Sequence, residues 1–162
     1  MKKLLLAVAA IIITAASVNA QGKTAFSLAG NIGVGTAQYY KLVAGGDLQA
    51  DFPATTGLKI TASAGYENFS YKVPVGNRIV SGHSSFIPLL AGAKFNLSPK
   101  AYGHAQLGYS VSTLSGAKGA FTYAPSIGYM ISQNFDLSIK YLGLSFSGGT
   151  IGGVVARLAY DF

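Results

Sequence analysis

The chain has 162 residues, no cysteine and a formal net charge of +7, and only 10% of its residues are charged. That share is too small to cover the exterior of a soluble domain, which normally uses about a quarter. The basic residues are scattered singly rather than gathered in one patch, which argues against nucleic-acid binding. The lack of cysteine excludes a disulfide framework.

The first predicted element, residues 1–20, has the pattern of a secretory signal peptide. Two lysines precede an apolar run of about thirteen residues, and small residues stand ahead of an expected cut between Ala20 and Gln21. This run is shorter than the roughly twenty residues that a transmembrane helix needs. An uncleaved anchor is the alternative, which is disfavoured because no stop-transfer pattern follows. We therefore expect an exported chain with one domain, residues 21–162.

The rest of the chain predicts eight strands in which apolar and polar residues alternate. Most contain eleven to thirteen residues. Strands of soluble proteins usually have about five or six residues, whereas a tilted strand that crosses a bilayer needs about nine to eleven. The predicted strands are residues 24–36, 42–52, 58–71, 86–97, 101–113, 120–132, 136–147 and 151–162.

The connections predict which end of each strand faces outward. The links after the second, fourth and sixth strands are tight turns, as expected on the periplasmic side of a membrane barrel. The other links should face outward, and the longest of them is the segment 73–85. With eight strands, both ends of the mature chain would lie on the periplasmic side.

In each predicted strand, the residues that point to one face are every second residue, and one of the two resulting sets is apolar and carries no charge. Such a face suits lipid, and closing the last strand on the first would pair the backbone groups of an open edge. The sequence thus predicts an all-β fold, an eight-stranded antiparallel transmembrane up-and-down barrel. A soluble lipocalin-like barrel with its apolar face inside is the alternative. Two aromatic girdles are expected, one with Phe52, Phe95, Tyr102, Phe135, Tyr160 and Phe162, the other with Tyr39, Tyr40, Tyr66, Tyr71, Phe86, Phe121 and Phe146.

The other alternate set is polar, and it contains every acidic residue of the chain and four basic ones. Inside a narrow barrel each charge would be costly unless paired, so we expect ion pairs and hydrogen bonds that fill a polar lumen. Solvated charges on the outside of a soluble barrel are the alternative. The predicted lumen network consists of Asp47, Asp51, Lys59, Glu67, Lys94, Asp136, Lys140, Arg157 and Asp161.

The sequence offers little that could carry catalysis or hold a metal or cofactor. The two histidines, His83 in the segment 73–85 and His104 on the polar face of a strand, do not form a metal-binding motif. All five carboxylates are assigned to the lumen, which leaves none for a catalytic site at the outer rim. We therefore predict no catalytic residue, no metal site and no cofactor.

Three stretches, residues 86–95, 121–129 and 157–162, resemble the small outer-membrane β-barrel proteins of Gram-negative bacteria. The resemblance extends over residues 21–162. It implies a place in the bacterial outer membrane, among lipid and lipopolysaccharide, and insertion by the barrel-assembly machinery, which reads a terminal strand that ends on an aromatic residue. The residues that match this signal are Leu158, Tyr160 and Phe162.

Two functions are compatible with such a barrel, because the fold alone does not define one. The first is a non-enzymatic structural or surface-interaction role, in which segment 73–85, with Lys72, Arg78 and His83, meets lipopolysaccharide phosphates or an extracellular partner. The second is a narrow transporter or ligand-binding barrel for small solutes. Eight strands enclose a bore that side chains can fill, so we expect the first.

Overall fold

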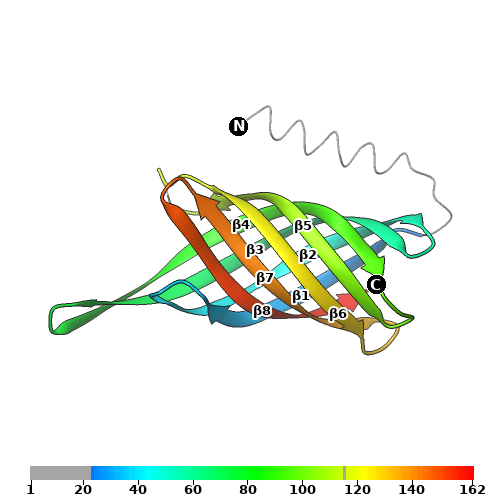
Figure 1. Cartoon of the computed structure of the whole chain (residues 1–162), viewed down its shortest axis with the longest axis horizontal. Helices are drawn as coiled ribbons and strands as arrows, with labels where there is room; N and C mark the ends of the chain where they lie inside the picture. The colour runs from blue at the N-terminus through cyan, green and yellow to red at the C-terminus, as the bar shows by residue number, and fades with distance from the viewer. Residues whose placement is uncertain (1–22, 115) are drawn as a thin grey trace.

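The computed structural model describes residues 23–114 and 116–162, which form one closed barrel (Figure 1). Each strand pairs antiparallel with its neighbours, and the last strand pairs with the first. The predicted eight-stranded antiparallel barrel is confirmed. The expected signal peptide, with its cut between Ala20 and Gln21, lies outside the described residues. The strands are β1 (Ala25–Gly35), β2 (Tyr40–Thr55), β3 (Leu58–Val75), β4 (Arg78–Asn96), β5 (Ala101–Ser112), β6 (Ala120–Met130), β7 (Phe135–Phe146) and β8 (Gly149–Asp161).

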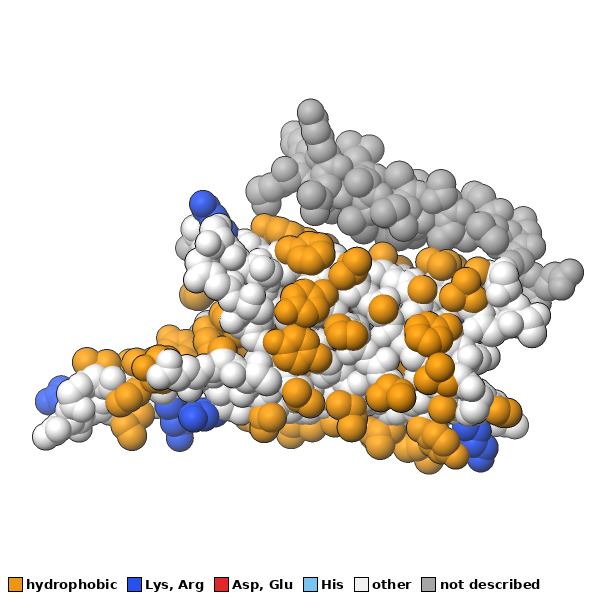
Figure 2. All heavy atoms as spheres, viewed as in Figure 1, with side chains coloured by type: hydrophobic (Ala, Val, Ile, Leu, Met, Phe, Trp, Pro, Cys, Tyr) orange, Lys and Arg blue, Asp and Glu red, His pale blue; other side chains and the backbone are white. Residues whose placement is uncertain are grey.

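The outer wall of the barrel is built from the apolar alternate residues (Figure 2). On β2, Leu48 is 57% exposed, whereas its neighbours Asp47 and Gln49 are 9% and 5% exposed. The Lys and Arg side chains visible in Figure 2 lie at the ends of the molecule rather than on the wall. Because the charged set points inward, the soluble alternative with a charged exterior is excluded. Within the described ranges, no helix is long and apolar enough to cross a membrane.

β3 and β4 continue beyond the barrel as a two-stranded hairpin, which projects at the left of Figure 1. The prediction of a long loop over residues 73–85 is wrong, because β3 continues to Val75 and β4 starts at Arg78. Gly76 and Asn77 form the turn, and the φ of +58° at Gly76 fits a type II′ turn. The valine and isoleucine residues on both sides favour extended strands, so the segment pairs with itself.

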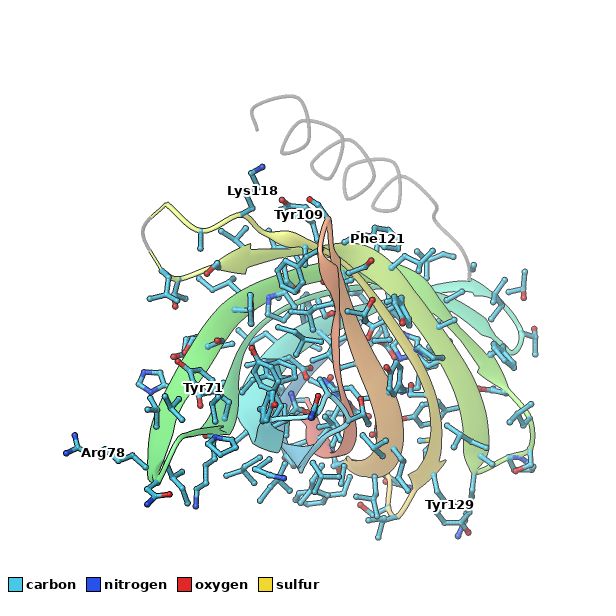
Figure 3. The ribbon with its side chains drawn as sticks, turned by 60° about the vertical axis from the view of Figure 1, so that its left-hand side comes forward. Tyr71, Arg78, Tyr109, Lys118, Phe121 and Tyr129 are labelled. Atoms are coloured by element: carbon cyan, nitrogen blue, oxygen red, sulfur yellow. The ribbon has the colours of Figure 1, made fainter. Side chains whose placement is uncertain are left out.

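Some of the aromatic residues predicted for the girdles face the interior instead: Tyr102, Phe86, Tyr40 and Phe146. Tyr102 and Phe86 are 3% and 5% exposed, since each belongs to the inward set of its strand. Outward aromatic residues do lie at both rims. Figure 3 shows Tyr109 and Phe121 near each other at one end and Tyr129 toward the opposite end.

Candidate functional site

Two layers of side chains fill the lumen. The first, the ionic layer, lies toward the end of the barrel where β1 begins and β8 ends, and the second, the apolar layer, lies toward the hairpin. The ionic layer consists of Asn31, Asp47, Asp51, Glu67, Lys94, Tyr102, His104, Asp136, Lys140 and Arg157. The apolar layer consists of Val43, Phe69, Phe86, Leu90, Ala120, Ala124, Leu142, Leu144 and Val155.

Arg157 on β8 is the centre of the ionic layer. Its guanidinium donates to both carboxylate oxygens of Asp47, with Nη2–Oδ1 at 2.9 Å and Nε–Oδ2 at 3.2 Å. Its Nη1 lies 3.6 Å from Oδ1 of Asp136, and its Nη2 also donates to Oγ of Ser27 at 3.3 Å. The planar guanidinium suits this bidentate geometry. Arg157 thereby joins carboxylates that belong to β2 and β7.

Lys140 on β7 holds a second group of charges. Its Nζ lies 3.4 Å from Oδ2 of Asp47 and 3.3 Å from Oε1 of Glu67. The Asn31 amide donates to the same two oxygens at 2.9 Å and 2.6 Å. Glu67 is 1% exposed, and a Cβ at Gly45 would overlap its carboxylate, so glycine makes room for it. One ammonium and one amide therefore offset part of the cost of burying two carboxylates, while Oε2 of Glu67 has no hydrogen-bond partner among the described residues.

A third group surrounds Lys94 on β4. Its Nζ lies 3.3 Å from Oδ2 of Asp136 and 3.5 Å from Oδ2 of Asp51. The Tyr102 hydroxyl donates to Oδ1 of Asp136 at 2.9 Å, and its ring centroid lies 4.0 Å from the Lys94 ammonium. Gln49 donates to Oδ1 of Asp51 at 2.7 Å. Sequence reasoning missed Tyr102, although its place on the inward set of β5 was a signal for it.

The remaining members of the predicted network lie at its edge. Nζ of Lys59 is 3.7 Å from Oδ2 of Asp51, but the Lys59 side chain is 38% exposed. Asp161 is partly exposed, and it makes no ion pair with any residue that the structure describes. His104 is buried, with Nε2 at 2.8 Å from Oγ1 of Thr61. The buried ion pairs thus lie deeper in the barrel than Lys59 and Asp161, which are partly exposed at its rim.

The apolar layer was not predicted, because a polar lumen was expected throughout. Phe69 is fully buried, and its ring meets the ring of Phe86 edge to face with centroids 6.0 Å apart. Leu142 and Leu144 on β7 are each 1% exposed and pack in the same cluster. A signal was present on β7, where two leucines follow Lys140 on the inward set of residues. A cluster of buried apolar side chains therefore lies in the lumen on the hairpin side of the charges.

The hairpin end of the molecule carries cations and, among the described residues, no carboxylate. Lys72 and His83 lie on the outward face of the hairpin, where their cross-strand partners are Ser81 and Ser70. Together with Lys41 they line an open groove at the base of the hairpin. Figure 3 shows Arg78 at the hairpin tip, far from the Lys118 loop on the same end of the barrel. This end is an electropositive surface.

The described ranges contain no group of three or more His, Asp or Glu side chains placed to hold a metal ion. The features that stand out are a closed ring of eight strands, an apolar outer wall and a lumen filled by side chains. These features define a small transmembrane β-barrel.

No protein-family model matches the sequence, and no curated protein sequence does either. The fold is similar to that of Ail, the attachment invasion locus protein of Yersinia pestis, with a TM-score of 0.62, 15% identity and coverage of 88% of this chain and 100% of that one. It is also similar to OprG of Pseudomonas aeruginosa, with a TM-score of 0.54, 10% identity and coverage of 86% and 95%. The N-terminal barrel domain of OprF from Pseudomonas aeruginosa matches with a TM-score of 0.51, 17% identity and coverage of 88% and 100%. At these identities the likeness concerns the fold.

Proposed function

We propose that this chain is an integral protein of the bacterial outer membrane with a non-enzymatic structural or surface-interaction role. The observation that carries the proposal is the division of its side chains between two environments. An uncharged apolar wall faces outward over the length of a bilayer crossing, while paired charges and a packed apolar layer fill the interior. A protein of this kind is stable in lipid, because the closed ring of strands pairs its backbone groups and the apolar wall meets acyl chains.

The apolar layer supports a closed barrel over a narrow transporter. An ion or polar solute that entered from the hairpin end would lose its water shell among Phe69, Phe86 and Leu144 before it reached a charged partner. Past that point, each carboxylate of the ionic layer is already paired with a cation of the protein. The interior is therefore better suited to hold the wall in shape than to pass a solute.

The surface-interaction part of the proposal rests on the electropositive hairpin end. In the proposed orientation this end faces the outside of the cell, where phosphate groups of lipopolysaccharide lie at the level of the rim. Lys41 and Lys118 lie at that level, whereas the hairpin with Lys72 and Arg78 extends past it toward an extracellular partner. Ail, a structural neighbour, has been crystallised with the heparin analogue sucrose octasulfate, which is also an anion.

The proposal includes a route to the membrane. Export would use residues 1–20, with cleavage between Ala20 and Gln21. Recognition by the barrel-assembly machinery would use Leu158 and Tyr160 on β8 and Phe162 directly after it, whose side chains are 50%, 45% and 69% exposed. Lipid would cover the same side chains after insertion.

Protease accessibility on intact cells tests the proposal. A protease site inserted between Gly76 and Asn77 should be cut in whole cells, whereas the same site inserted in the Ser98–Lys100 turn should be cut only after the outer membrane is opened. The protein should fractionate with outer membranes, and purified protein in planar bilayers should give no steady conductance. Cleavage at both sites in whole cells, recovery in the soluble periplasmic fraction, or a reproducible conductance that changes with Lys94→Met would contradict it.

A further inference from the structure

The hairpin of β3 and β4 has two edges that differ in chemistry. On the β5 side, pairing of β4 ends at Phe86, and the carbonyl of Ser85 accepts a final hydrogen bond from the Thr113 amide. In an antiparallel strand, alternate residues direct both N–H and C=O to the same side. The backbone groups of residues 83, 81 and 79 therefore face the same way as those of Ser85, and the described part of the chain gives them no strand partner.

The other edge of the hairpin is closed to an incoming strand. The Lys72 amide donates to the Tyr39 carbonyl, which is the last bond that joins β3 to the β2 side. By the same alternation, the next residue directed to that side is Pro74, which has no N–H to offer. Proline on an edge strand is a common protection against unwanted pairing. β4 has no such protection between residues 79 and 84, since this segment contains no proline and no inward-pointing charge.

The side chains along the open edge select the chemistry of a partner. Lys72 and His83 are exposed on the outward face, and no carboxylate is described at this end of the molecule. On the opposite face of the hairpin, Val75 and Val80 are 59% and 51% exposed. A strand that alternates acidic and branched apolar residues would complement both faces. A second copy of this chain would bring the same cations together, so electrostatics disfavours it.

We propose that the open edge of β4, residues 79–84, binds an extended acidic segment of another protein by strand addition. The added strand pairs with the N–H and C=O groups of Ile79, Ser81 and His83, its carboxylates lie near Lys72 and His83, and its apolar residues cover Val80. Main-chain hydrogen bonds provide most of the affinity in this mode of recognition, and the side chains provide selectivity. The inference deepens the proposed surface role and rests on the hairpin being outside the cell.

The test uses the full mature chain in lipid nanodiscs and a fluorescent peptide that alternates Glu and Val. The decisive variant is Ser81→Pro, which removes an N–H from the open edge and leaves the hydrogen bonds between β3 and β4 in place. Ser81→Ala is the matched control, since it changes the side chain and keeps the N–H. We expect Ser81→Pro to weaken binding by about tenfold or more and Ser81→Ala to change it by less than about twofold.

Two further peptides test the contributions of main-chain hydrogen bonds and of the peptide charges to binding. A peptide N-methylated at alternate amides along one edge should lose binding, and so should a peptide with Lys in place of Glu. Binding by the Lys peptide as tight as by the Glu peptide would overturn the proposal, as would equal affinity of the Ser81→Pro and Ser81→Ala proteins. The proposal would also be overturned if the protein formed dimers without peptide and Ser81→Pro dissociated them, because a second copy of the chain would then occupy the edge. The assay uses purified protein, so its failure is distinct from failure of the whole-cell protease test.

Discussion

Side chains of the ionic layer are held by hydrogen bonds and ion pairs that join distant strands, whereas those of the apolar layer are held by packing. Arg157, for example, contacts carboxylates on two other strands, while Phe69 contacts other rings and aliphatic groups. The two layers fill the same bore, so they differ in how strongly the loss of one side chain destabilises the barrel. A charge cannot lose its partner without leaving another charge buried, but an apolar side chain can be replaced at a cost set by the volume left empty.

The largest effect is expected from Arg157→Met. This change leaves the buried carboxylates of Asp47 and Asp136 with one cation fewer, and the free energy of unfolding should fall by about 3–5 kcal/mol. Urea unfolding of the protein folded in lipid vesicles measures it. Leu158→Met, on the outward face of the same strand, is the control and should change stability by less than about 1.5 kcal/mol. An Arg157→Met protein as stable as the control would mean that the ion pairs are not buried.

Phe69→Ala is the matching change in the apolar layer. The cavity should cost about 3–4 kcal/mol, at the lower end of what buried aromatic truncations cost, because Phe86 can move partly into the space. The same urea titration measures it. This loss should not depend on salt concentration, because no charge is involved. A loss that shrinks as salt is added would remove the distinction between the layers.

A double replacement tests whether the ionic layer can become apolar. Lys140→Met alone should lower stability by about 3 kcal/mol, since Glu67 then keeps only the Asn31 amide. Lys140→Met combined with Glu67→Leu should recover stability to within about 1 kcal/mol of the original, because Asp47 keeps Arg157. A thermodynamic cycle from the four proteins gives the coupling. Losses that simply add in the double variant would show that the two residues do not interact.

The smallest effect is expected outside both layers. Replacing residues 74–79 by Asn-Gly shortens the hairpin to the level of Val73 and Val80, which already face each other. None of the removed residues belongs to the ionic or the apolar layer, so the free energy of unfolding should change by less than about 0.5 kcal/mol. Unfolding at a markedly lower urea concentration would mean that the hairpin supports the barrel, rather than projecting from it.

The fold was predictable because an alternation with a period of two recurs along the chain and, within the eight predicted strands, charge appears on one set only. The same logic failed at the apolar layer, where both sets are apolar and the alternation vanishes. Residues 86–90, for example, are apolar at every position, so the sequence does not distinguish inward Phe86 and Leu90 from outward Ile87.

The contacts within the ionic layer were beyond sequence reasoning for a different reason. The alternation along a strand places a charge inside the barrel. The residue that pairs with this charge depends on the register of strands that are distant in the chain, as for Asp47 and Arg157. The hairpin, in contrast, was missed although local chemistry indicates it. Gly76-Asn77 between segments rich in valine and isoleucine is a two-residue turn signal, and it explains why residues 73–85 do not form a loop.

The central claim is that alternate residues of each strand face lipid and the lumen, and labelling of single cysteines tests it most directly. The chain has no cysteine of its own, so Leu48→Cys and Gln49→Cys, or Ile139→Cys and Ser138→Cys, each give one labelled site on the same strand. With a fluorophore on the thiol and a nitroxide quencher on the lipid acyl chain, strong quenching is expected at positions 48 and 139 and little labelling or quenching at 49 and 138. Equal quenching at adjacent positions, or none at 48 and 139, would contradict the account.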